Sequence, residues 1–314
     1  MKGIILAGGN GTRLFPSTMV ISKQLLPVYD KPMVYYPLSV LLLAGIRDIL
    51  VITRPSDRHM FESLLRDGRQ FGVSISYAVQ PHPEGIAQAL LIGKDFIDGG
   101  SCALVLGDNV FHGDGLAKML KAAARYSTGA TIFAHEVADP QRYGVVTFDG
   151  ADRAIAVEEK PAKPRSKWAI TGLYFFGAEA VRYAAEVGPS GRGELEVTDI
   201  IRRYLDAGAL RIERMGRGYA WFDMGTIDSL VGASEFVAAI ERRQGSKICC
   251  PEEIALRSKF ISPKELDDWL SRFGENAYSD YVRRVASEWG SQIGEQSVKN
   301  DLTTDSDASK NPSS

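Results

Sequence analysis

Short apolar runs alternate with amphipathic stretches through the first two-thirds of the chain, and this order restricts the fold more than any other feature. Runs rich in Ile, Val and Leu predict strands at residues 2–7, 48–53, 74–79, 102–106 and 130–137. Apolar residues at helical spacing predict helices at residues 32–44, 57–65, 86–96 and 116–126. This alternation is typical of an α/β fold with a mostly parallel central sheet flanked by helices. Ligands bind such sheets beyond the carboxyl ends of the strands, so the loops at 8–13, 80–85 and 107–109 are candidate binding segments.

The remainder of the chain continues this pattern and then becomes helical. Strands are predicted at residues 145–148, 154–159, 169–176, 210–214 and 219–223, and helices at 178–186, 196–207 and 228–243. We expect one α/β domain over residues 1–245 and a helical appendage over residues 246–288 that makes regulatory or subunit contacts. Residues 289–314 are expected to be a disordered tail, because from residue 291 the sequence is rich in Ser, Thr, Asp and Asn and has no aromatic residue.

Charge and composition exclude several classes of protein. The chain has 37 Lys and Arg against 39 Asp and Glu, a net charge of −2, which argues against nucleic acid as the main partner. No apolar run approaches the roughly 20 residues of a membrane span, so no membrane partner is expected. The three cysteines are too few and too oddly placed for a disulfide framework or a zinc site. A reducing compartment, the cytoplasm, is therefore expected.

A glycine-rich loop follows the first predicted strand directly. Gly8, Gly9, Gly11 and Thr12 lie in this loop, where free backbone N–H groups can hold phosphate oxygens. The loop does not match the P-loop pattern, because no Gly-Lys-Ser/Thr follows at the right distance. It does not match the dinucleotide-binding pattern either, because Leu14 stands where the third glycine would be. This disfavours a Rossmann dehydrogenase. Cations follow at Arg13 and Lys23, and both residue types bind phosphate. An ordinary tight turn with solvated cations is the alternative.

Two aspartates stand at the ends of predicted strands. Asp108 follows a buried strand next to a glycine, and Asp223 ends another predicted strand. If the two converge they could bind Mg²⁺, which takes few carboxylates and keeps phosphate or water oxygens. For Asp108, a role in capping the next helix is the alternative. Glu159 and Lys160 lie on opposite faces of a regular strand, so a bulge or twist at Pro161 would be needed to bring both into one pocket.

The motifs in combination resemble the glucose-1-phosphate thymidylyltransferases, a branch of the sugar nucleotidyltransferase family. The resemblance covers residues 1–286 and rests on segments 8–14, 22–33, 106–109, 142–146, 158–161, 192–199 and 216–226. It implies a Rossmann-like nucleotidyltransferase fold and Mg²⁺-dependent transfer of a thymidylyl group from dTTP to glucose 1-phosphate, with release of pyrophosphate. It also implies the first step of dTDP-L-rhamnose-type deoxysugar biosynthesis. The reaction needs positioning and charge neutralisation but no side-chain nucleophile.

The resemblance also implies roles for individual residues. Arg13 and Lys23 would hold the triphosphate together with Gly8, Gly9, Gly11 and Thr12, and Asp108 and Asp223 would bind Mg²⁺. Lys160 would anchor the sugar phosphate and Arg192 would close over phosphate. The thymine would meet Gln80 and Gly85, with Gln24 a further contact on the nucleotide side. The sugar would meet Gly144, Glu159 and Gly172, with Tyr174 lining the pocket and Trp221 at its floor.

Assembly and regulation follow from the same resemblance. Relatives are typically homotetramers with a second nucleotide site for feedback inhibition, so we expect a homotetramer and a dTDP-sugar inhibitor. Arg217, Cys250 and Glu253 match part of that second site. One departure from the family pattern is Met224, which stands where Thr is usual after the metal-binding Asp.

Two other functions remain open at this level. One is a related transferase that uses UTP or another sugar 1-phosphate, because a single methyl group provides only about 1–3 kcal/mol of discrimination. The other is a non-catalytic nucleotide-sugar sensor. The joint presence of the five charged candidates, Arg13, Lys23, Asp108, Lys160 and Asp223, argues against the sensor.

Overall fold

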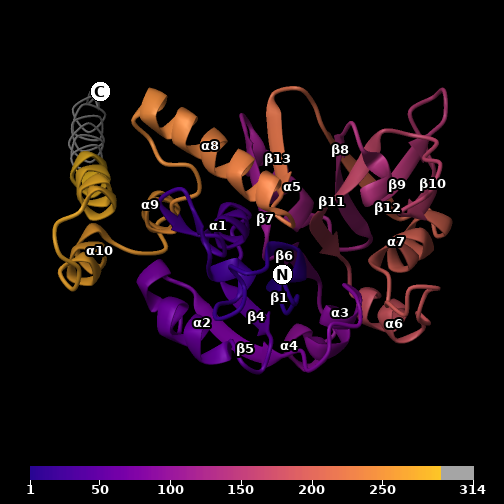
Figure 1. Ribbon diagram of the computed structural model, residues 1–314, viewed down its shortest axis with the longest axis horizontal. Helices are drawn as coiled ribbons and strands as arrows, with labels where there is room; N and C mark the ends of the chain where they lie inside the picture. The colour runs from indigo at the N-terminus through magenta and orange to yellow at the C-terminus, as the bar shows by residue number, and fades with distance from the viewer. Residues whose placement is uncertain (291–314) are drawn as a thin grey trace, which may run out of the picture. The chain divides into compact units, whose positions relative to one another are not determined.

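A mixed β-sheet forms the centre of the fold. The computed structural model describes residues 1–290, and within them nine strands form one sheet in the order β10-β9-β11-β6-β1-β4-β5, with β8 beside β11 and β12 beside β8 (Figure 1). These strands are β1 (Lys2–Ala7), β4 (Asp48–Thr53), β5 (Ser74–Val79), β6 (Cys102–Leu106), β8 (Ala130–Glu136), β9 (Gly144–Phe148), β10 (Ala154–Glu159), β11 (Trp168–Phe176) and β12 (Leu210–Met215).

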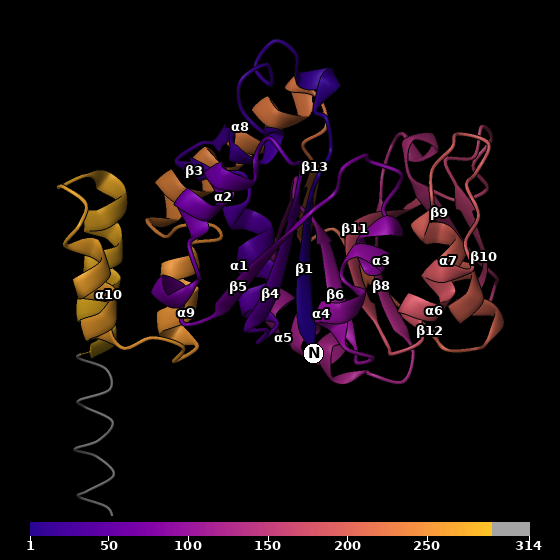
Figure 2. The same ribbon diagram turned by 90° about the horizontal axis from the view of Figure 1, so that it is seen from below.

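The sheet has a parallel part, formed by β1, β4, β5 and β6, and a part around β11 in which most pairs are antiparallel. β1 pairs in parallel with β4 and β6, and β4 pairs in parallel with β5 (Figure 2). β11 then runs antiparallel to β6, β8 and β9, and β12 returns to parallel pairing with β8. The expected α/β class, with a sheet flanked by helices, is confirmed. The carboxyl ends of β1 and β6 lie side by side because the two strands are parallel neighbours.

Helices cover both faces of the sheet. Helices α1 (Tyr35–Leu43) and α5 (Leu116–Arg125) lie on one face, and α3 (Gln88–Ile92) and α4 (Lys94–Ile97) lie on the other (Figure 1). On the second face, Ile4 of β1 belongs to the same buried core as Leu90 and Ile97. A single helix over residues 86–96 was expected, and this is wrong. The helix is interrupted at Gly93, a weak helix former that separates α3 from α4.

A two-stranded sheet stands beside the main one. It pairs β7 (Asn109–Gly113) with β13 (Tyr219–Asp223) in antiparallel register. The sequence predicts β13 but not β7. Residues 1–250 also contain smaller or peripheral elements. These are β2 (Pro27–Val28), β3 (Lys31–Pro32), α2 (Arg58–Leu65), α6 (Ala180–Ala185), α7 (Val197–Asp206), α8 (Ile227–Gln244) and the 3₁₀ turns η1 (Thr12–Leu14), η2 (Lys23–Leu25), η3 (Arg69–Phe71) and η4 (Pro140–Arg142).

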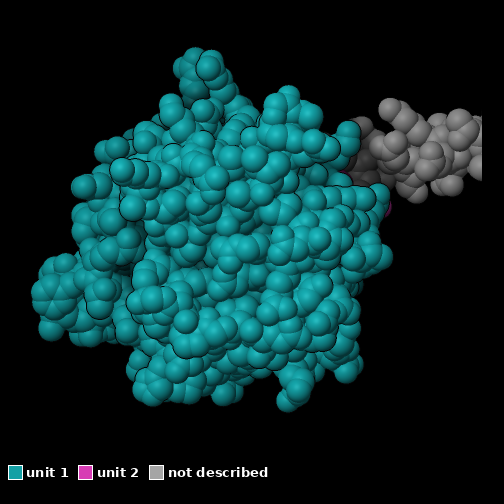
Figure 3. Space-filling view, turned by 90° about the vertical axis from the view of Figure 1, so that its right-hand side faces the viewer, with its two compact units in different colours: residues 1–69, 73–250 teal, residues 70–72, 251–314 magenta. Residues whose placement is uncertain are grey.

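The chain divides into two compact units. Unit 1 comprises residues 1–69 and 73–250, and the described part of unit 2 comprises residues 70–72 and 251–290 (Figure 3). Unit 2 contains α9 (Pro251–Arg257), α10 (Pro263–Leu270) and a helix over residues 277–290. The domain boundary expected at 245 and 246 stays a prediction, and residues 291–314 of the expected tail lie outside the described residues. Within residues 1–290, no helix combines the length and the apolar character needed to cross a bilayer.

A buried cluster of charges joins the β2–β3 hairpin to the end of α8. The side chain of Lys31 is 1% exposed and that of Glu241 is 6% exposed, with Lys31 Nζ 3.0 Å from Glu241 Oε1. Lys31 also pairs with Asp30, and Lys247 pairs with both carboxylates. Glu241 Oε1 accepts a further hydrogen bond from the backbone N–H of Ile248 at 2.9 Å. Each buried charge therefore has an opposite charge beside it, as burial requires.

We expect Lys31→Met to lower the free energy of unfolding by about 3 kcal/mol, because it removes one partner from a buried ion pair and leaves Glu241 short of positive charge. Urea unfolding at neutral pH would measure the change. The matched control is Arg58→Met, which breaks an exposed pair with Glu62 on α2 and should cost about 0.5 kcal/mol or less. Equal losses in the two variants would contradict this account of the cluster.

Candidate active site

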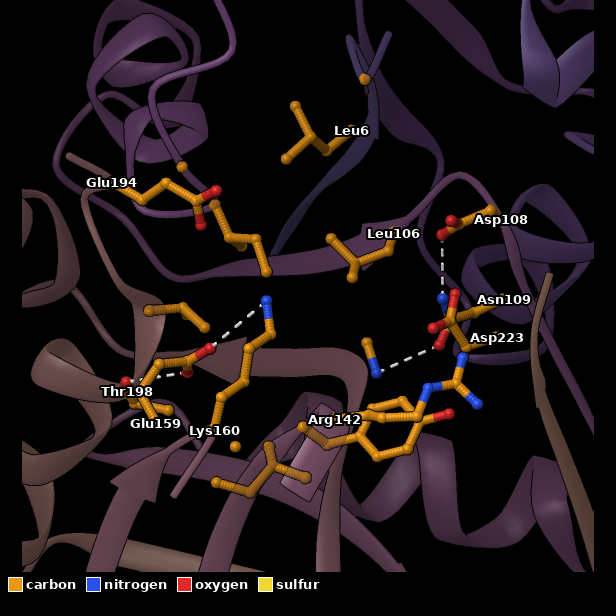
Figure 4. Close-up of a pocket in the computed structure, with 18 of the residues that line it drawn as sticks. Leu6, Leu106, Asp108, Asn109, Arg142, Glu159, Lys160, Glu194, Thr198 and Asp223 are labelled. Carbon is orange, nitrogen blue, oxygen red and sulfur yellow. Dashed lines mark hydrogen bonds and ion pairs between the residues drawn. The ribbon is translucent and has the colours of Figure 1, made fainter. Parts of the chain in front are cut away.

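A cavity of about 590 Å³ opens where β1 and β6 end, the place at which α/β sheets bind ligands. Eight of its polar side chains form two groups, with Leu6 and Leu106 between them (Figure 4). We call the first group the aspartate end, and it consists of Asp108, Asn109, Arg142 and Asp223. We call the second group the glutamate end, and it consists of Glu159, Lys160, Glu194 and Thr198. The cavity thus has two chemically different ends.

The aspartate end is assembled by the pairing of β7 with β13. Asp108 lies in the turn between β6 and β7, and Asp223 is the last residue of β13, where it stands opposite Asn109 in the strand register. The backbone N–H of Met224 donates to the carbonyl oxygen of Asp108 at 3.0 Å. Two aspartates that are distant in the sequence therefore line one cavity, as expected.

The two carboxylates influence each other's pKa values. Burial, together with the negative charge of Asp108, raises the pKa of Asp223 to about 6. Burial also acts to raise the pKa of Asp108, but the charge and hydrogen bond of Lys23 outweigh it and leave this pKa below its usual range. Positive charges at Lys23, Arg13 and Arg142 partly offset the effect on Asp223. The nearby positive charges therefore do not fully neutralise the two carboxylates, and the pKa of Asp223 remains raised.

The aspartate end fits a divalent cation. Mg²⁺ is usually held by one or two carboxylates together with water and substrate phosphate oxygens, and Asp108 and Asp223 supply two carboxylates in one cavity. A cation between them would relieve the repulsion that raises the pKa of Asp223. Within the described residues no group of three or more His, Cys, Asp or Glu side chains could hold a metal.

The glutamate end depends on an unusual backbone at Lys160. β10 ends at Glu159, and Lys160 has a φ of 39°, which turns its side chain out of strand alternation. The change of direction expected at Pro161 thus occurs one residue earlier. Both side chains line the cavity, with Lys160 Nζ 3.8 Å from Glu159 Oε1. Thr198 Oγ1 donates to Glu159 Oε2 at 3.1 Å, and burial raises the pKa of Glu159. A cation and a hydrogen-bond acceptor therefore share this end.

The segment with Gln80 and Gly85 forms a third part of the wall. Gln80 is 2% exposed, and its Nε2 donates to Gln88 Oε1 at 2.6 Å, so Oε1 is the atom of its amide left to accept a bond. Gly85 has a φ of 111°, and a Cβ there would lie 2.4 Å from the carbonyl oxygen of Leu195. Only glycine allows this approach. Backbone hydrogen bonds from Leu195 to Glu84 and from Ala87 to Leu195 fasten the two segments together.

Most of the residues expected in the site line the cavity: Gly9, Arg13, Gln80, Gly85, Asp108, Gly144, Glu159, Lys160, Gly172, Tyr174, Trp221 and Asp223. Six others, Arg192 among them, lie outside that lining. Lys23 is paired with Asp108, Gln24 is buried and accepts from Ser22, and Gly8 lies against Gln80. Gly11 and Thr12 form the start of η1. The roles assigned to these residues stay predictions.

Arg192 is placed differently from the expectation. It is absent from the cavity lining, and its Nη2 lies 2.8 Å from Glu196, 3.1 Å from Glu159 and 3.2 Å from Glu194. Three carboxylates therefore hold the guanidinium that was expected to close over phosphate. Its phosphate role stays a prediction.

Sequence reasoning assigned no role to several residues of the lining: Asn109, Arg142, Tyr143, Glu194 and Thr198. All five lie inside the motifs that carry the family resemblance, so their segments were marked. The sequence does not predict which of the side chains in these segments point into the cavity. Tyr143, for example, packs against Trp221 with ring centroids 5.0 Å apart, a contact between residues far apart in the chain.

The three residues expected to form a regulatory site are not brought together in one cavity. Arg217 lines a separate cavity of about 460 Å³ with His135, Lys167 and Trp168, among others. Neither Cys250 nor Glu253 belongs to the lining of that cavity. Cys250 is buried at the end of unit 1, and Glu253 lies on α9 in unit 2. The regulatory site stays a prediction.

The chain is similar to a known family over most of its length. It matches the Nucleotidyl transferase family over residues 2–240. It is 56% identical over 285 residues to a glucose-1-phosphate thymidylyltransferase from Xanthomonas campestris, with 91% of this chain and 97% of the relative covered. A glucose-1-phosphate thymidylyltransferase from Mycobacterium tuberculosis is 51% identical over 282 residues, with 90% of this chain and 98% of the relative covered.

The chain is also similar to solved structures of nucleotidyltransferases. A Bacillus anthracis protein assigned as a glucose-1-phosphate thymidylyltransferase and solved with sucrose has a TM-score of 0.70 and 41% identity, covering 75% of this chain and 94% of its own. A UDP-glucose pyrophosphorylase complexed with UDP-glucose has a TM-score of 0.67 at 23% identity, covering 77% of this chain and 99% of its own. The second similarity concerns the fold alone.

We expect Asp223→Asn to stabilise the protein in the presence of a chelator at pH 7.5. A carboxyl whose pKa is raised to about 6 on folding contributes stability below the unfolded pKa and loses it as the pH rises through 6. Removing the charge should add about 1–2 kcal/mol at pH 7.5, less than the full shift implies because the group is partly solvated. The gain should shrink towards pH 4.

Melting temperatures followed by circular dichroism at pH 7.5 and pH 4.5 would measure this effect. Mg²⁺ should stabilise the wild type and leave Asp223→Asn unchanged, because the variant lacks one of the two carboxylates. A variant that melts below the wild type at pH 7.5 in chelator would contradict the assignment of repulsion at this end.

We expect Lys23→Met to bind Mn²⁺ more tightly than the wild type when no nucleotide is present. The Lys23 ammonium is paired with Asp108 and so competes with a cation for that carboxylate. Its removal should lower the dissociation constant for Mn²⁺ about tenfold, the equivalent of roughly 1.4 kcal/mol, while binding of a nucleoside triphosphate weakens. Electron paramagnetic resonance titration and calorimetry would measure the two affinities. Lys121→Met, on the exposed side of α5, is the control and should change neither. Weaker Mn²⁺ binding in Lys23→Met would refute the competition.

Proposed function

The chain belongs to the nucleotidyl transferase family, and from that premise we propose that it is a glucose-1-phosphate thymidylyltransferase. The reaction transfers a thymidylyl group from dTTP to glucose 1-phosphate and releases pyrophosphate. The high identity to thymidylyltransferases over about nine-tenths of the chain supports this function. The observation that carries it is the single cavity whose aspartate end suits a triphosphate with its cation and whose glutamate end suits a sugar phosphate.

The chemistry requires two anionic substrates to meet. An oxygen of the sugar phosphate attacks the α-phosphorus in line with the departing pyrophosphate, so the protein must position both groups and neutralise their charge. A divalent cation held by Asp108 and Asp223 would stabilise the charge on the phosphate oxygens. Arg13, beside the glycine-rich loop, and Lys23, beside Asp108, would bind the triphosphate and the leaving pyrophosphate.

The glutamate end supports binding of the sugar phosphate. Lys160 projects into the cavity from the end of β10, where its ammonium can hold the phosphate as a point charge. Glu159, oriented by Thr198, can accept hydrogen bonds from sugar hydroxyl groups, as can the backbone near Gly144. Trp221 and Tyr143 supply an aromatic wall. No side-chain nucleophile is required, since the attacking atom belongs to the substrate.

The Gln80 segment supports recognition of a pyrimidine. Gln88 fixes the amide of Gln80 so that Oε1 remains to accept a bond, and the N3–H of thymine is a suitable donor. Uracil presents the same edge. UTP is therefore the second candidate nucleotide. Discrimination at the base would rest on the 5-methyl group, and discrimination at the sugar on the 2′-hydroxyl group that UTP carries and dTTP lacks.

Several finer features belong to the same proposal. We propose Mg²⁺ as the cation, the cytoplasm as the location, and a homotetramer as the assembly. We also propose that the product enters dTDP-L-rhamnose-type deoxysugar biosynthesis and that a dTDP-sugar inhibits the enzyme through a site that includes Arg217, Cys250 and Glu253.

Pyrophosphate release tests the function directly. With Mg²⁺ and glucose 1-phosphate, we expect release from dTTP, slower release from UTP, and very little from ATP or GTP. Omission of glucose 1-phosphate, or addition of a chelator, should stop the reaction, because the attacking oxygen or the charge neutralisation is then missing. Tight binding of dTTP without turnover would instead indicate a non-catalytic nucleotide-sugar sensor. Faster turnover with another sugar 1-phosphate would reassign the sugar.

A further inference from the structure

Asn109 occupies the point where three strands meet the aspartate end of the cavity. It follows Asp108 and begins β7, and its backbone stands opposite Asp223 of β13. The residue is 1% exposed although it is polar. A buried amide needs partners for both its oxygen and its nitrogen, since each unpaired group costs free energy.

The side chain of Asn109 joins three separate elements. Its Nδ2 donates to Asp108 Oδ1 at 3.0 Å. Its Oδ1 accepts from Trp221 Nε1 at 2.6 Å and from the backbone N–H of Gly172 at 3.1 Å. One planar amide therefore connects the turn after β6 with β13 and β11.

The chemistry of the partners fixes the orientation of this amide. The indole of Trp221 and the backbone N–H of Gly172 can only donate, so the atom that faces them must be the amide oxygen. The nitrogen is then directed at Asp108. An aspartate here would place a second negative charge beside Asp108, and a leucine would offer neither donor nor acceptor.

The backbone N–H of Gly172 is available to Asn109 because the strand pairing is interrupted at Gly172. The pairing of β11 with β8 is interrupted between Ile170 and Tyr174, so Gly172 lies where the ladder changes register. A Cβ at Gly172 would approach Asn109 Oδ1 to 2.7 Å, a distance that real Cβ atoms do not adopt. Glycine thus permits the close approach that the hydrogen bond needs.

Asn109 and Lys23 hold different oxygens of the same carboxylate. Lys23 contacts Oδ2 of Asp108, and Asn109 contacts Oδ1. The Lys23 ammonium is a point charge that triphosphate oxygens would also attract, whereas the Asn109 amide is held in addition by Gly172 and Trp221. The contact from Asn109 therefore persists when Lys23 turns to a nucleotide.

We propose that Asn109 is a positioning residue that keeps the Asp108 carboxylate oriented for the divalent cation. The inference rests on the proposed function, because it presupposes that Asp108 is a ligand of that cation. The inference goes beyond the proposed function, because it assigns the orientation of the Asp108 carboxylate to Asn109, which also contacts Trp221. Partners that orient metal ligands typically affect metal affinity about 10- to 100-fold.

The test measures Mn²⁺ binding to nucleotide-free protein by electron paramagnetic resonance. We expect Asn109→Ala to raise the dissociation constant for Mn²⁺ about tenfold. The variant should also melt at a lower temperature, because Trp221 and Gly172 lose their acceptor. A lower melting temperature with an unchanged dissociation constant would mean a merely structural role and would overturn the proposal. If Asn109→Ala does not fold, Asn109→Ser, which keeps a small polar group, is expected to change the dissociation constant in the same direction and is judged by the same criterion.

Two matched variants separate the possible causes. Thr171→Val removes another buried hydrogen bond, from Thr171 Oγ1 to the carbonyl oxygen of Phe133 at 3.0 Å, one residue from Gly172. It should lower stability without changing Mn²⁺ affinity, and an effect as large as that of Asn109→Ala would overturn the proposal. Asp108→Asn should abolish Mn²⁺ binding. Binding retained in that variant would refute the proposed cation site itself, whereas loss there with wild-type affinity in Asn109→Ala would refute the positioning role alone.

Discussion

The pairing of β7 with β13 is the constraint on which the site depends. It places Asp223 opposite Asn109 and therefore beside Asp108, although more than a hundred residues separate the two aspartates in the chain. The parallel core of the sheet supports this arrangement, because β1 and β6 end next to each other and deliver the glycine-rich loop and the Asp108 turn to one edge. Every other part of the cavity is arranged around that edge.

The convergence of two carboxylates opposes stability. Burial, together with the negative charge of Asp108, raises the pKa of Asp223 to about 6, and the surrounding cations compensate only in part. The same concentration of negative charge attracts positive charge, both that of Lys23, Arg13 and Arg142 and that of a divalent cation. Stability lost in the free protein and affinity gained for charged ligands therefore have one physical origin, as is common at functional sites.

Much of the fold could be predicted from the sequence, because buried strands carry their signal locally. β1, β4, β5, β6, β10 and β13 have the expected bounds. β7 was not expected, since its strand character depends on a partner far along the chain. The candidate residues were found by motif, but the positive φ of Lys160, the carboxylates around Arg192 and the contacts of Asn109 were not. These features depend on tertiary contacts and backbone geometry that local periodicity does not encode.

The close contact of Gly85 with Leu195 affects how such an enzyme can change its substrates. Leu195 leads directly into α7, which supplies Thr198 to Glu159, while Gly85 belongs to the segment of Gln80. The Gln80 segment, proposed to face the base, is thus linked mechanically to the glutamate end of the cavity, proposed to face the sugar. A change that widens one wall will shift the other. Lineages that acquire a new base or a new sugar should therefore carry compensating changes on both sides of this contact.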